Sequence, residues 1–504
     1  MHLSPSGSLT LAATDLGRFL ACRHLTGLDV EVAFGKRKKP PVYPDPFLDL
    51  LIQRGLAHEK DYTGKIEKGG SAVLDLTESH GPDAVARTIE AMKAGKPAIA
   101  QGALAADGWF GRPDFLQKVD KPSSLGPFSY EAIDTKLSRE TRGSTILQLS
   151  FYSDILGSIQ GIQPEFFHVV TPIASEKYRV SDFAAYYRLV KRRLEEAAGS
   201  DAEALLSANY PEPVDFCDVC RWWQQCDSRR RDDDHLSLVA GITRLNRREF
   251  EANDVKTLER LGLLRLPIPF KPAKCSKESL EKVQGQARVQ LAGRRAGKPV
   301  HELLLPPEEG RGLLRLPEPS PGDVFLDLEG DHFAAEGPRE YLFGMTVLGP
   351  KGETSHLSLW AETDAKEKDV FETILDRIGE LWKANPGMHV YHFGHYETDR
   401  FKALMGRHAT RARELDRMLR AELFVDLCAV VKQGLRTSVE SYSIKKLEPF
   451  YDFTRKADLR YAGAARRAVE FGLQTGDLTV LTPEVKDLVA LYNEEDCVSA
   501  LRLR

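Results

Sequence analysis

Two side chains that could act on a phosphate stand two residues apart in the segment FSYEAIDTKL, at 128–137. We predict a strand there, and residues two apart on a strand leave the same face, so Asp134 and Lys136 point together. A carboxylate in this position can hold a divalent metal, while the ammonium orients a water or offsets the charge that develops on a phosphate. Glu131 is a competing acid, but its odd spacing puts it on the other face. The pair is a candidate catalytic site, although a D-x-K on a strand is by itself more often an exposed ion-pair face.

Residues on neighbouring elements could complete this site. Asp114 comes at the end of a predicted hairpin over 97–119 and could give the same metal a second carboxylate. His58 closes a predicted helix and could add an imidazole. Gln148 and Tyr152 are four apart on a further predicted helix, so they share a face and could hold a DNA strand beside the metal. Mainly oxygen ligands favour magnesium or manganese, and one histidine among them favours tolerance of manganese.

A second candidate site begins in the segment DVFLDLEGD, at 323–331, where Asp327 and Glu329 share one face of a predicted strand. Two carboxylates that point together are unfavourable without a cation. A two-metal site for phosphoryl transfer, with ions about 3.5–4 Å apart, would account for them. The residues on both sides of Asp327 are apolar, which favours a buried strand over a solvent-facing one.

The last third of the chain supplies further candidates for this second site. Tyr492 and Asp496 are four apart on the predicted final helix, so Asp496 could complete the metal cage while Tyr492 orients the attacking water. Glu397 follows a predicted strand at 388–393 and would be the fourth acid. Asp399, two residues later, is a rival ligand. The pattern therefore predicts a cage of four acids beside a tyrosine.

The chain has seven cysteines, and three of them, Cys217, Cys220 and Cys226, fall within ten residues. A C-x-x-C pair with a third cysteine close by indicates a metal centre that needs one more ligand. Cys22, on a predicted N-terminal helix, is the best candidate for the fourth. Four thiolates suit zinc and an iron–sulfur cluster equally well, so the spacing leaves both open.

By residue composition and predicted elements, the 504 residues divide into the blocks 1–230, 231–318 and 319–504. The first and last blocks mix helices with strands, and the middle block is predicted to be a small helical and basic segment. Composition is ordinary for a globular protein, with 42% hydrophobic and 29% charged residues and a net charge of −4. Residues 271–300 hold eight Lys/Arg against two acids, a stretch that could bind a phosphate backbone or form solvated helix faces.

Membrane and motor functions are disfavoured by the sequence. No stretch approaches the roughly 18 uninterrupted apolar residues of a transmembrane helix, and the N-terminus lacks a basic region followed by an apolar run. We therefore expect a cytoplasmic protein with no membrane partner. No G-x-x-x-x-G-K-[ST] motif occurs, so this chain carries no ATP-driven motor of its own.

The order of the first set of motifs resembles the RecB-like branch of the PD-(D/E)xK nuclease superfamily. That order is a histidine, an aspartate after a hairpin, D-x-K on the next strand and Q-x-x-x-Y on the next helix. The resemblance implies a restriction-endonuclease-like α/β domain. The active-site residues that it carries over are His58, Asp114, Asp134 and Lys136, with Gln148 and Tyr152 in support.

The cysteine pattern adds to this resemblance. One early and three late cysteines around a RecB-like core look like the iron–sulfur nucleases, which include CRISPR-associated RecB-like exonucleases and the nuclease halves of several nuclease-helicases. On that pattern a [4Fe–4S] cluster would join the two ends of the domain, with zinc as the alternative. The implied ligands are Cys22, Cys217, Cys220 and Cys226.

Over about 322–504, the predicted order of strand, hairpin, helix, strand, helix and final helix is that of a ribonuclease H-like fold. With D-x-E early and Y-x-x-x-D last, the segment resembles the DEDDy 3′→5′ exonucleases, most closely their YprB-like members. The family usually has an aspartate at the second motif, where this chain has Glu397. The segment at 441–451 is similar to the family's substrate-side helix, which implies that Lys445 and Lys446 meet phosphates.

Together, the motifs resemble RecB-family nucleases that carry a ribonuclease H-like domain after an iron–sulfur nuclease, joined by a small helical segment. The resemblance implies a Mg²⁺- or Mn²⁺-dependent DNA nuclease that acts on single strands or ends in repair, defence or CRISPR adaptation. It also implies a superfamily 1 helicase partner, either in a longer chain or as a separate protein. Two alternatives remain: a DNA-end-binding factor that recruits a helicase or integrase, and a 3′→5′ ribonuclease that works through the C-terminal site.

Overall fold

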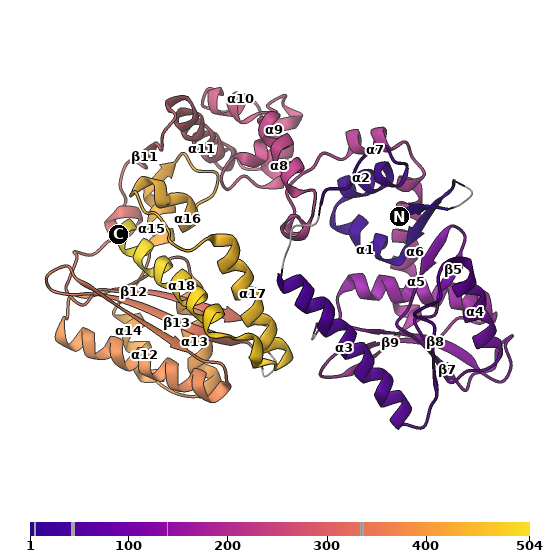
Figure 1. Ribbon diagram of the computed structural model, residues 1–504. Helices are drawn as coiled ribbons and strands as arrows, with labels where there is room; N and C mark the ends of the chain where they lie inside the picture. Colours follow the sequence, from indigo (N-terminus) through magenta and orange to yellow (C-terminus); the bar gives the residue numbers. More distant parts are fainter. Residues whose placement is uncertain (5–6, 42–45, 139, 333, 335–336) are drawn as a thin grey trace. The chain divides into compact units, whose positions relative to one another are not determined.

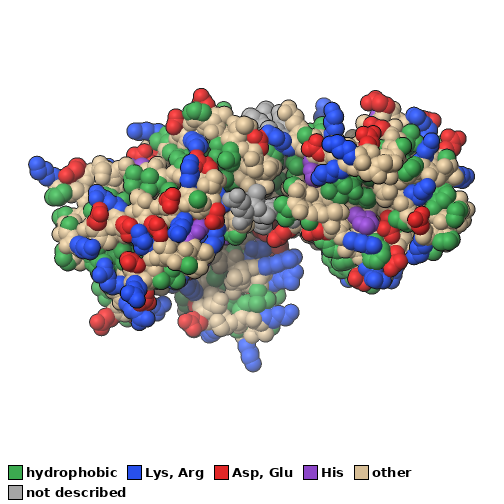
Figure 2. Space-filling view, turned by 90° about the horizontal axis from the view of Figure 1, so that it is seen from below, with side chains coloured by type: hydrophobic (Ala, Val, Ile, Leu, Met, Phe, Trp, Pro, Cys, Tyr) green, Lys and Arg blue, Asp and Glu red, His purple; other side chains and the backbone are tan. Residues whose placement is uncertain are grey.

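The computed structural model describes residues 1–4, 7–41, 46–138, 140–332, 334 and 337–504. The chain folds into two compact units, Met1–Asp227 and Ser228–Arg504 (Figure 1). The helical segment 231–318 belongs to the second unit. On the face that Figure 2 displays, basic and acidic side chains are interspersed, which agrees with the near-balanced charge of the chain. In the part of the chain that is described, no helix combines the length and the apolar character that crossing a membrane requires.

The first unit is built on a six-stranded mixed sheet in the order β10-β9-β8-β7-β4-β3. β8 runs antiparallel to β7 and parallel to β9, and its residues from Ser129 to Asp134 are buried. The predicted strand at 128–137 is confirmed. The strands are β3 (Val73–Asp75), β4 (Ala98–Ala100), β7 (Phe115–Val119), β8 (Ser129–Thr135), β9 (Phe166–Val170) and β10 (Ser175–Arg179).

The hairpin predicted over 97–119 consists of two antiparallel pairs that belong to different sheets. β5 and β6 form a hairpin in a small sheet of order β1-β2-β6-β5, whereas β4 and β7 pair in the large sheet. Asp107 and Gly108 both have positive φ, as the predicted tight turn between twisted strands demands. The strands of the small sheet are β1 (His2–Leu3), β2 (Leu9–Ala12), β5 (Leu104–Ala106) and β6 (Trp109–Gly111).

Helix α5 packs against β8 and forms the centre of the first core. Its buried residues surround much of the helix, and Gly161 ends it in the left-handed conformation that a glycine adopts without strain. The helices of this part are α1 (Ala13–Ala21), α2 (Arg23–Ala33), α3 (Pro46–Lys68), α4 (Gly81–Lys93), α5 (Gly143–Gln160), α6 (Val180–Ala198), α7 (Ala202–Ala208), the 3₁₀ turn η1 (Asp215–Val219) and α8 (Trp223–Asp232).

The second unit contains a five-stranded sheet in the order β14-β13-β12-β15-β16. β12, β15 and β16 are parallel, and β13 and β14 extend the sheet as an antiparallel hairpin. These elements confirm the predicted strands and hairpin. The strands are β12 (Val324–Asp331), β13 (Arg339–Leu348), β14 (Thr354–Trp360), β15 (Val390–His392) and β16 (Phe424–Asp426).

The alternation of β12 divides its side chains between two faces of the sheet. Leu326 and Leu328 lie in a core with α12, α13 and α14, whereas Phe325 lies in a core with α18. Asp327 and Glu329 have the parity of Phe325, so they face α18. The helices that cover this sheet are α12 (Asp364–Ala384), α13 (Tyr396–His408), α14 (Ala412–Arg420), α15 (Leu427–Gly434), α16 (Ile444–Leu447), α17 (Leu459–Thr475) and α18 (Pro483–Leu503).

Residues 231–318 are integrated into the second unit. Their helices share an apolar cluster, and β11 pairs with β17 in an antiparallel ladder. On α11, Gln286 donates to the Thr437 carbonyl at 2.9 Å and accepts from the Tyr442 hydroxyl at 2.8 Å. The elements are α9 (Arg244–Ala252), α10 (Leu258–Leu263), α11 (Lys277–Ala296), β11 (His301–Leu303) and β17 (Leu435–Thr437). Three arginines of the basic stretch are in ion pairs: Arg288 with Glu302, Arg294 with Asp234 and Arg295 with Glu259.

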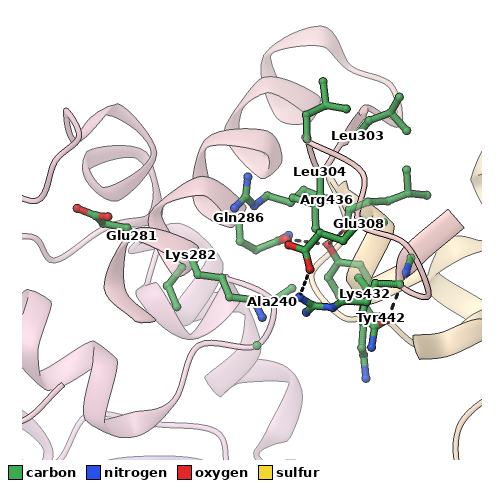
Figure 3. Close-up of a pocket in the computed structure, with 18 of the residues that line it drawn as sticks. Ala240, Glu281, Lys282, Gln286, Leu303, Leu304, Glu308, Lys432, Arg436 and Tyr442 are labelled. Carbon is green, nitrogen blue, oxygen red and sulfur yellow. Dashed lines mark hydrogen bonds and ion pairs between the residues drawn. The ribbon is translucent and has the colours of Figure 1, made fainter. Parts of the chain in front are cut away.

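A cavity of about 1020 Å³ lies where α11, β17 and the segment 303–314 meet (Figure 3). Gln286, Arg436 and Tyr442 lie close together on its wall in that view. Exposed leucines, among them Leu305 and Leu314, form its rim. The candidate catalytic carboxylates are not among the described residues that line this cavity.

Candidate active sites

Asp327, Glu329 and Asp496 come together in the second unit. β12 presents the first two on one face and α18 brings the third, and one oxygen of each carboxylate lies within 4.8 Å of the others. The final helix begins at Pro483, where the fixed φ of proline suits the first helical turn. Thr482 caps it through its side chain. The strand and the helix are thus both regular, and they converge at the three acids.

Burial and mutual repulsion raise the proton affinity of these acids. Burial, followed by the charges of Asp496, Glu329 and Glu397, raises the pKa of Asp327 well above its ordinary value. Burial also raises the pKa of Glu329 to about 7, although Arg466 opposes the shift. Carboxylates gathered in this way are stable only when protons or cations compensate their charge.

Glu397 faces this site and Asp399 does not. Glu397 is buried in the first turn of α13, and its charge acts on Asp327. Its Oε2 lies 3.4 Å from His392 Nδ1 and accepts no hydrogen bond from any residue that the structure describes. Asp399 is exposed and pairs with Lys402 at 3.6 Å. The role of Glu397 as a metal ligand stays a prediction, but it is the acid of this motif that lies near the site.

Three cations and one amide contact the carboxylates at 2.5–2.9 Å: Lys445 on Asp496, Arg455 on both Asp496 and Glu448, Arg466 on Glu329, and Asn493 on Asp327. Arg455, Arg466 and Asn493 were not anticipated from the sequence. A single arginine in a helix or loop carries no spacing signal. Asn493 follows Tyr492 directly and precedes Asp496 by three residues, so helical geometry alone could have identified it.

Tyr492 lies among these cations. Its ring centroid is 4.7 Å from Lys445 Nζ and 5.6 Å from the guanidinium carbons of Arg455 and Arg466. Burial and the Asp496 carboxylate raise the pKa of the Tyr492 phenol, which therefore stays protonated at neutral pH and can hold a water by hydrogen bonding. Lys446, the other predicted phosphate contact, is exposed.

The donor set of this site fits a hard divalent cation. All four acids offer oxygen, which Mg²⁺ and Mn²⁺ prefer. Two buried oxygens, Glu397 Oε2 and Asn493 Oδ1, have no hydrogen-bond partner among the described residues. Lys445 and Arg466 supply the positive charge that bound metal would otherwise provide.

A second group with metal-ligand geometry, Asp364, Glu367 and His408, has a different character. Arg407 is ion-paired with both acids, and His408 Nε2 lies 2.8 Å from Glu367 Oε2. The other oxygen of Glu367 accepts the backbone N–H of Glu340 at 2.6 Å. The guanidinium already neutralises this group, which joins the start of α12 to the end of α13.

In the first unit, Asp114 and Asp134 face each other on the β7–β8 ladder. Phe115 pairs with Ile133, so the next position along sets the two acids opposite each other. Asp134 is fully buried, and Lys136 Nζ lies 2.5 Å from its Oδ2. Oδ1 accepts no hydrogen bond from the residues described. Burial, together with the Asp114 carboxylate, raises the pKa of Asp134 to about 7.

Glu59 is a further acid near this pair that the sequence did not single out. It accepts a hydrogen bond from Gln101 at 2.7 Å, and Gln101 also reaches Asp114 at 3.4 Å. Burial raises the pKa of Glu59, and the Asp114 charge adds to the shift. Its spacing gave no signal, because a residue adjacent to His58 on a helix does not share its face.

The sequence-based placement of His58 at a helix end is wrong. α3 continues to Lys68, because Tyr62 and Ile66, four residues apart, share a helix face that packs against the core around Phe115. His58 therefore lies within the helix, and its Nε2 is 3.1 Å from the Val170 carbonyl oxygen at the end of β9. The histidine stands near the strand ends that carry the acids, and its role as a ligand stays a prediction.

Gln148 and Tyr152 contact each other, as their spacing indicates. Gln148 donates to the Tyr152 hydroxyl at 3.0 Å, and that hydroxyl donates to the Arg112 carbonyl at 3.0 Å. Tyr152 is buried against Gly111, where a Cβ atom would lie 2.5 Å from the tyrosine ring. Tyr152 is thus fixed in the core, and the partly exposed Gln148 is the member of the pair that can reach a ligand.

The four predicted cluster ligands lie in one region of the first unit. Cys22 stands between α1 and α2, and the other three lie at or after η1. Burial raises the pKa of Cys22 and of Cys220, and the Cys217 thiol acts electrostatically on both. Cys22, Cys220 and Cys226 pack against an apolar cluster that contains the buried Trp222. Thiols from opposite ends of the unit therefore lie near one another, but among the described residues they do not form a group whose ligand atoms all lie within 4.8 Å, so the metal centre stays a prediction.

Comparison with known proteins bears on the second unit. No curated protein matches the chain. Residues 324–504 match a family described as the RNase_H superfamily. This range begins at β12 and ends with α18, so it contains Asp327, Glu329, Glu397 and Asp496. The match supports the ribonuclease H-like part of the predicted fold, and it indicates a metal-dependent activity of the nuclease type. In this respect residues 324–504 are similar to ribonuclease H-like domains.

Proposed function

We propose that the protein is a metal-dependent nuclease that shortens DNA strands from their 3′ ends through the acids of the second unit. The observation that carries the proposal is the convergence of Asp327, Glu329 and Asp496, within a domain that matches the ribonuclease H superfamily. Single-stranded DNA and DNA ends are the proposed substrates. Mg²⁺ or Mn²⁺ bound by the acids would polarise the phosphate and lower the pKa of a bound water.

The chain's own residues have distinct tasks in this reaction. Tyr492 orients the attacking water, because its protonated hydroxyl stands beside Asp496. Lys445 offsets charge near the phosphate. Water adds to phosphorus while the bond to the 3′ oxygen breaks, the water proton passes to solvent and the leaving oxygen takes one up. The products are a shortened strand with a 3′ hydroxyl and a nucleoside 5′-monophosphate.

The first unit supports a second hydrolytic site of the RecB-like type. Asp134 is buried, has an oxygen without a partner among the described residues, and stands opposite Asp114 beside Lys136. A divalent metal held by the two acids would satisfy that oxygen. Lys136 then offsets charge on the phosphate or holds the water, with His58 and Gln148 at the edge. This site is the proposed nuclease of the first unit.

A [4Fe–4S] cluster on the four cysteines is part of the proposal, with zinc as the alternative. The electrostatic influence among Cys22, Cys217 and Cys220, and the apolar cluster that Cys22 shares with Cys220 and Cys226, support a metal centre that joins the two ends of the unit. Iron and acid-labile sulfide content, together with a visible absorption band, would distinguish the cluster from zinc. Loss of the band on Cys22→Ser would test the assignment of the most distant ligand.

The decisive experiment digests end-labelled single-stranded DNA and RNA with Mn²⁺. The variants are Asp327→Asn and Asp134→Asn, and Asp399→Asn is the control because that acid is exposed and paired with Lys402. We expect release of labelled mononucleotide from 3′-labelled DNA by the wild type and the control, and loss of this product with Asp327→Asn. Unchanged digestion by Asp327→Asn would overturn the assignment to the second unit.

The same experiment tests the alternatives. If only Asp134→Asn abolishes cleavage, the activity belongs to the first unit. Comparison of 5′-labelled with 3′-labelled DNA would then show from which end that unit cleaves. RNA degradation in preference to DNA, lost with Asp327→Asn, would indicate a ribonuclease. DNA binding without cleavage by any form would indicate an end-binding factor. A helicase partner, in the same polypeptide or separate, belongs to the proposal and would be sought by its effect on digestion of duplex ends.

A further inference from the structure

Arg466 and Arg455 both contact the acids of the second unit, but their surroundings differ. The Arg455 side chain is 6% exposed and bridges Glu448 and Asp496. Glu448 also accepts a hydrogen bond from Ser499 on α18 at 3.1 Å. Arg455 is therefore built into a buried hydrogen-bonded frame, where its charge supports Asp496 whether or not a substrate is present.

Arg466, in contrast, is partly exposed. Its side chain is 33% exposed, and its Nε lies 2.9 Å from an oxygen of Glu329, one of the proposed metal ligands. Its guanidinium carbon is 5.6 Å from the centroid of the Tyr492 ring, the ring assigned to the attacking water. The guanidinium is thus beside both a metal ligand and the water-holding tyrosine.

Occupation of the site changes what Arg466 can bind. When Glu329 gives its oxygen to a metal ion, its capacity to accept from Arg466 falls, while the phosphate of a bound nucleotide brings new acceptors to the same place. A guanidinium matches the oxygens of a phosphate in a paired, planar geometry that an ammonium lacks. Arg466 also pairs with Glu470 on its own helix, but only at 3.7 Å, and its side chain is one-third exposed. A turn of its outer guanidinium nitrogens towards a phosphate therefore breaks fewer close contacts than the same movement of the enclosed Arg455 would.

We propose that Arg466 is a catalytic residue of the second unit, which binds a non-bridging oxygen of the terminal phosphate once metal has taken Glu329. The inference rests on the proposed function. It adds a residue that recognises the phosphate of the 3′-terminal nucleotide and remains on the phosphate of the released 5′-mononucleotide. Arg466 therefore contributes to retention of the product as well as to the rate.

Binding of the product tests the proposal without any need for turnover. Thymidine 5′-monophosphate and thymidine are titrated in Mn²⁺ by calorimetry, with the wild type, Arg466→Met and Arg466→Lys. The control is Arg460→Met, on the same helix, because Arg460 is 91% exposed. We expect Arg466→Met to weaken mononucleotide binding by about tenfold or more, with no change for thymidine, and Arg466→Lys to restore part of it.

Two further measurements separate this role from a structural one. Mn²⁺ affinity, followed by electron paramagnetic resonance, should be equal or higher in Arg466→Met, since Glu329 loses a competing cation. The exonuclease rate should fall by about 100-fold, the usual cost of removing one donor to a developing charge. Equal mononucleotide affinity in wild type and Arg466→Met would refute the inference. Absence of Asp327-dependent cleavage in the wild type would instead refute the proposed function.

Discussion

The two units gather acids in different ways, and the difference bears on what each site can do. In the first unit, Asp114 and Asp134 lie opposite each other on one antiparallel ladder, with Lys136 as the cation in contact with Asp134. In the second, a strand and a distant helix bring three acids together, and several cations surround them. The first arrangement is compact and suits one or two ions held by two acids. The second has the wider acidic cage that a two-metal reaction needs.

The largest expected effect is on metal binding. Asp496→Asn should abolish the Mn²⁺ sites of the second unit and leave that of the first, and Asp134→Asn should do the reverse. Each removes a buried carboxylate around which the other ligands are arranged. Counting bound Mn²⁺ by electron paramagnetic resonance gives the answer. If either substitution removed Mn²⁺ from both units, the two sites would not be independent.

The next effect is on the free energy of unfolding, which should differ between substitutions of Arg455 and of Arg466. Arg455→Met leaves Glu448 and Asp496 without their buried partner, which typically costs about 3–5 kcal/mol of unfolding free energy. Arg466→Met should cost less than Arg455→Met, because it leaves one buried carboxyl, Glu329, whose pKa of about 7 lets it take up a proton in place of the lost cation. Urea unfolding of the metal-free protein measures both. Equal losses of unfolding free energy would contradict this prediction, because the two arginines would then contribute equally to stability.

The pH dependence of the metal-free protein should reflect both sites. Folding raises the pKa of Asp134 and of Glu329 to about 7, so the folded state holds protons that the unfolded chain has released. These groups therefore stabilise the fold at low pH, and their contribution is lost as the pH rises towards 7. The melting temperature in EDTA should fall between pH 5 and 8. Asp134→Asn and Glu329→Gln should each flatten that fall, and Mn²⁺ should remove it; a slope that neither variant changes would contradict the assignment.

The smallest expected effect concerns the acid that departs from the family pattern. Glu397→Asp restores the usual residue but withdraws the carboxylate by one methylene, so we expect the exonuclease rate to change by less than about tenfold. Glu397→Gln should lower it much further if Glu397 binds metal. The measurement is the rate of mononucleotide release in Mg²⁺ and in Mn²⁺. Identical rates for wild type and Glu397→Gln would exclude a ligand role.

Much of the second unit could be predicted because its site uses regular elements. The alternation around Asp327 fixed the face of β12, and the four-residue spacing of Tyr492 and Asp496 fixed the face of α18. The cations could not be predicted, since Arg455 lies in a loop and Arg466 in a helix that reach the site only through tertiary packing. In the first unit, the end of α3 was misplaced because its second half carries a single apolar pair at helical spacing, Tyr62 and Ile66, among charged residues.

The ladder between β11 and β17 has a consequence for how the ribonuclease H-like part of the chain can be isolated. The family match begins at residue 324, but residues 301–303 already pair with 435–437. A fragment that begins at residue 324 would lack β11, so the backbone groups of β17 that pair with it would be left unpaired. Such an open edge invites association with other chains. We therefore expect a fragment that begins near residue 228, at the boundary between the two units, to be soluble, and a fragment that begins at residue 324 to aggregate.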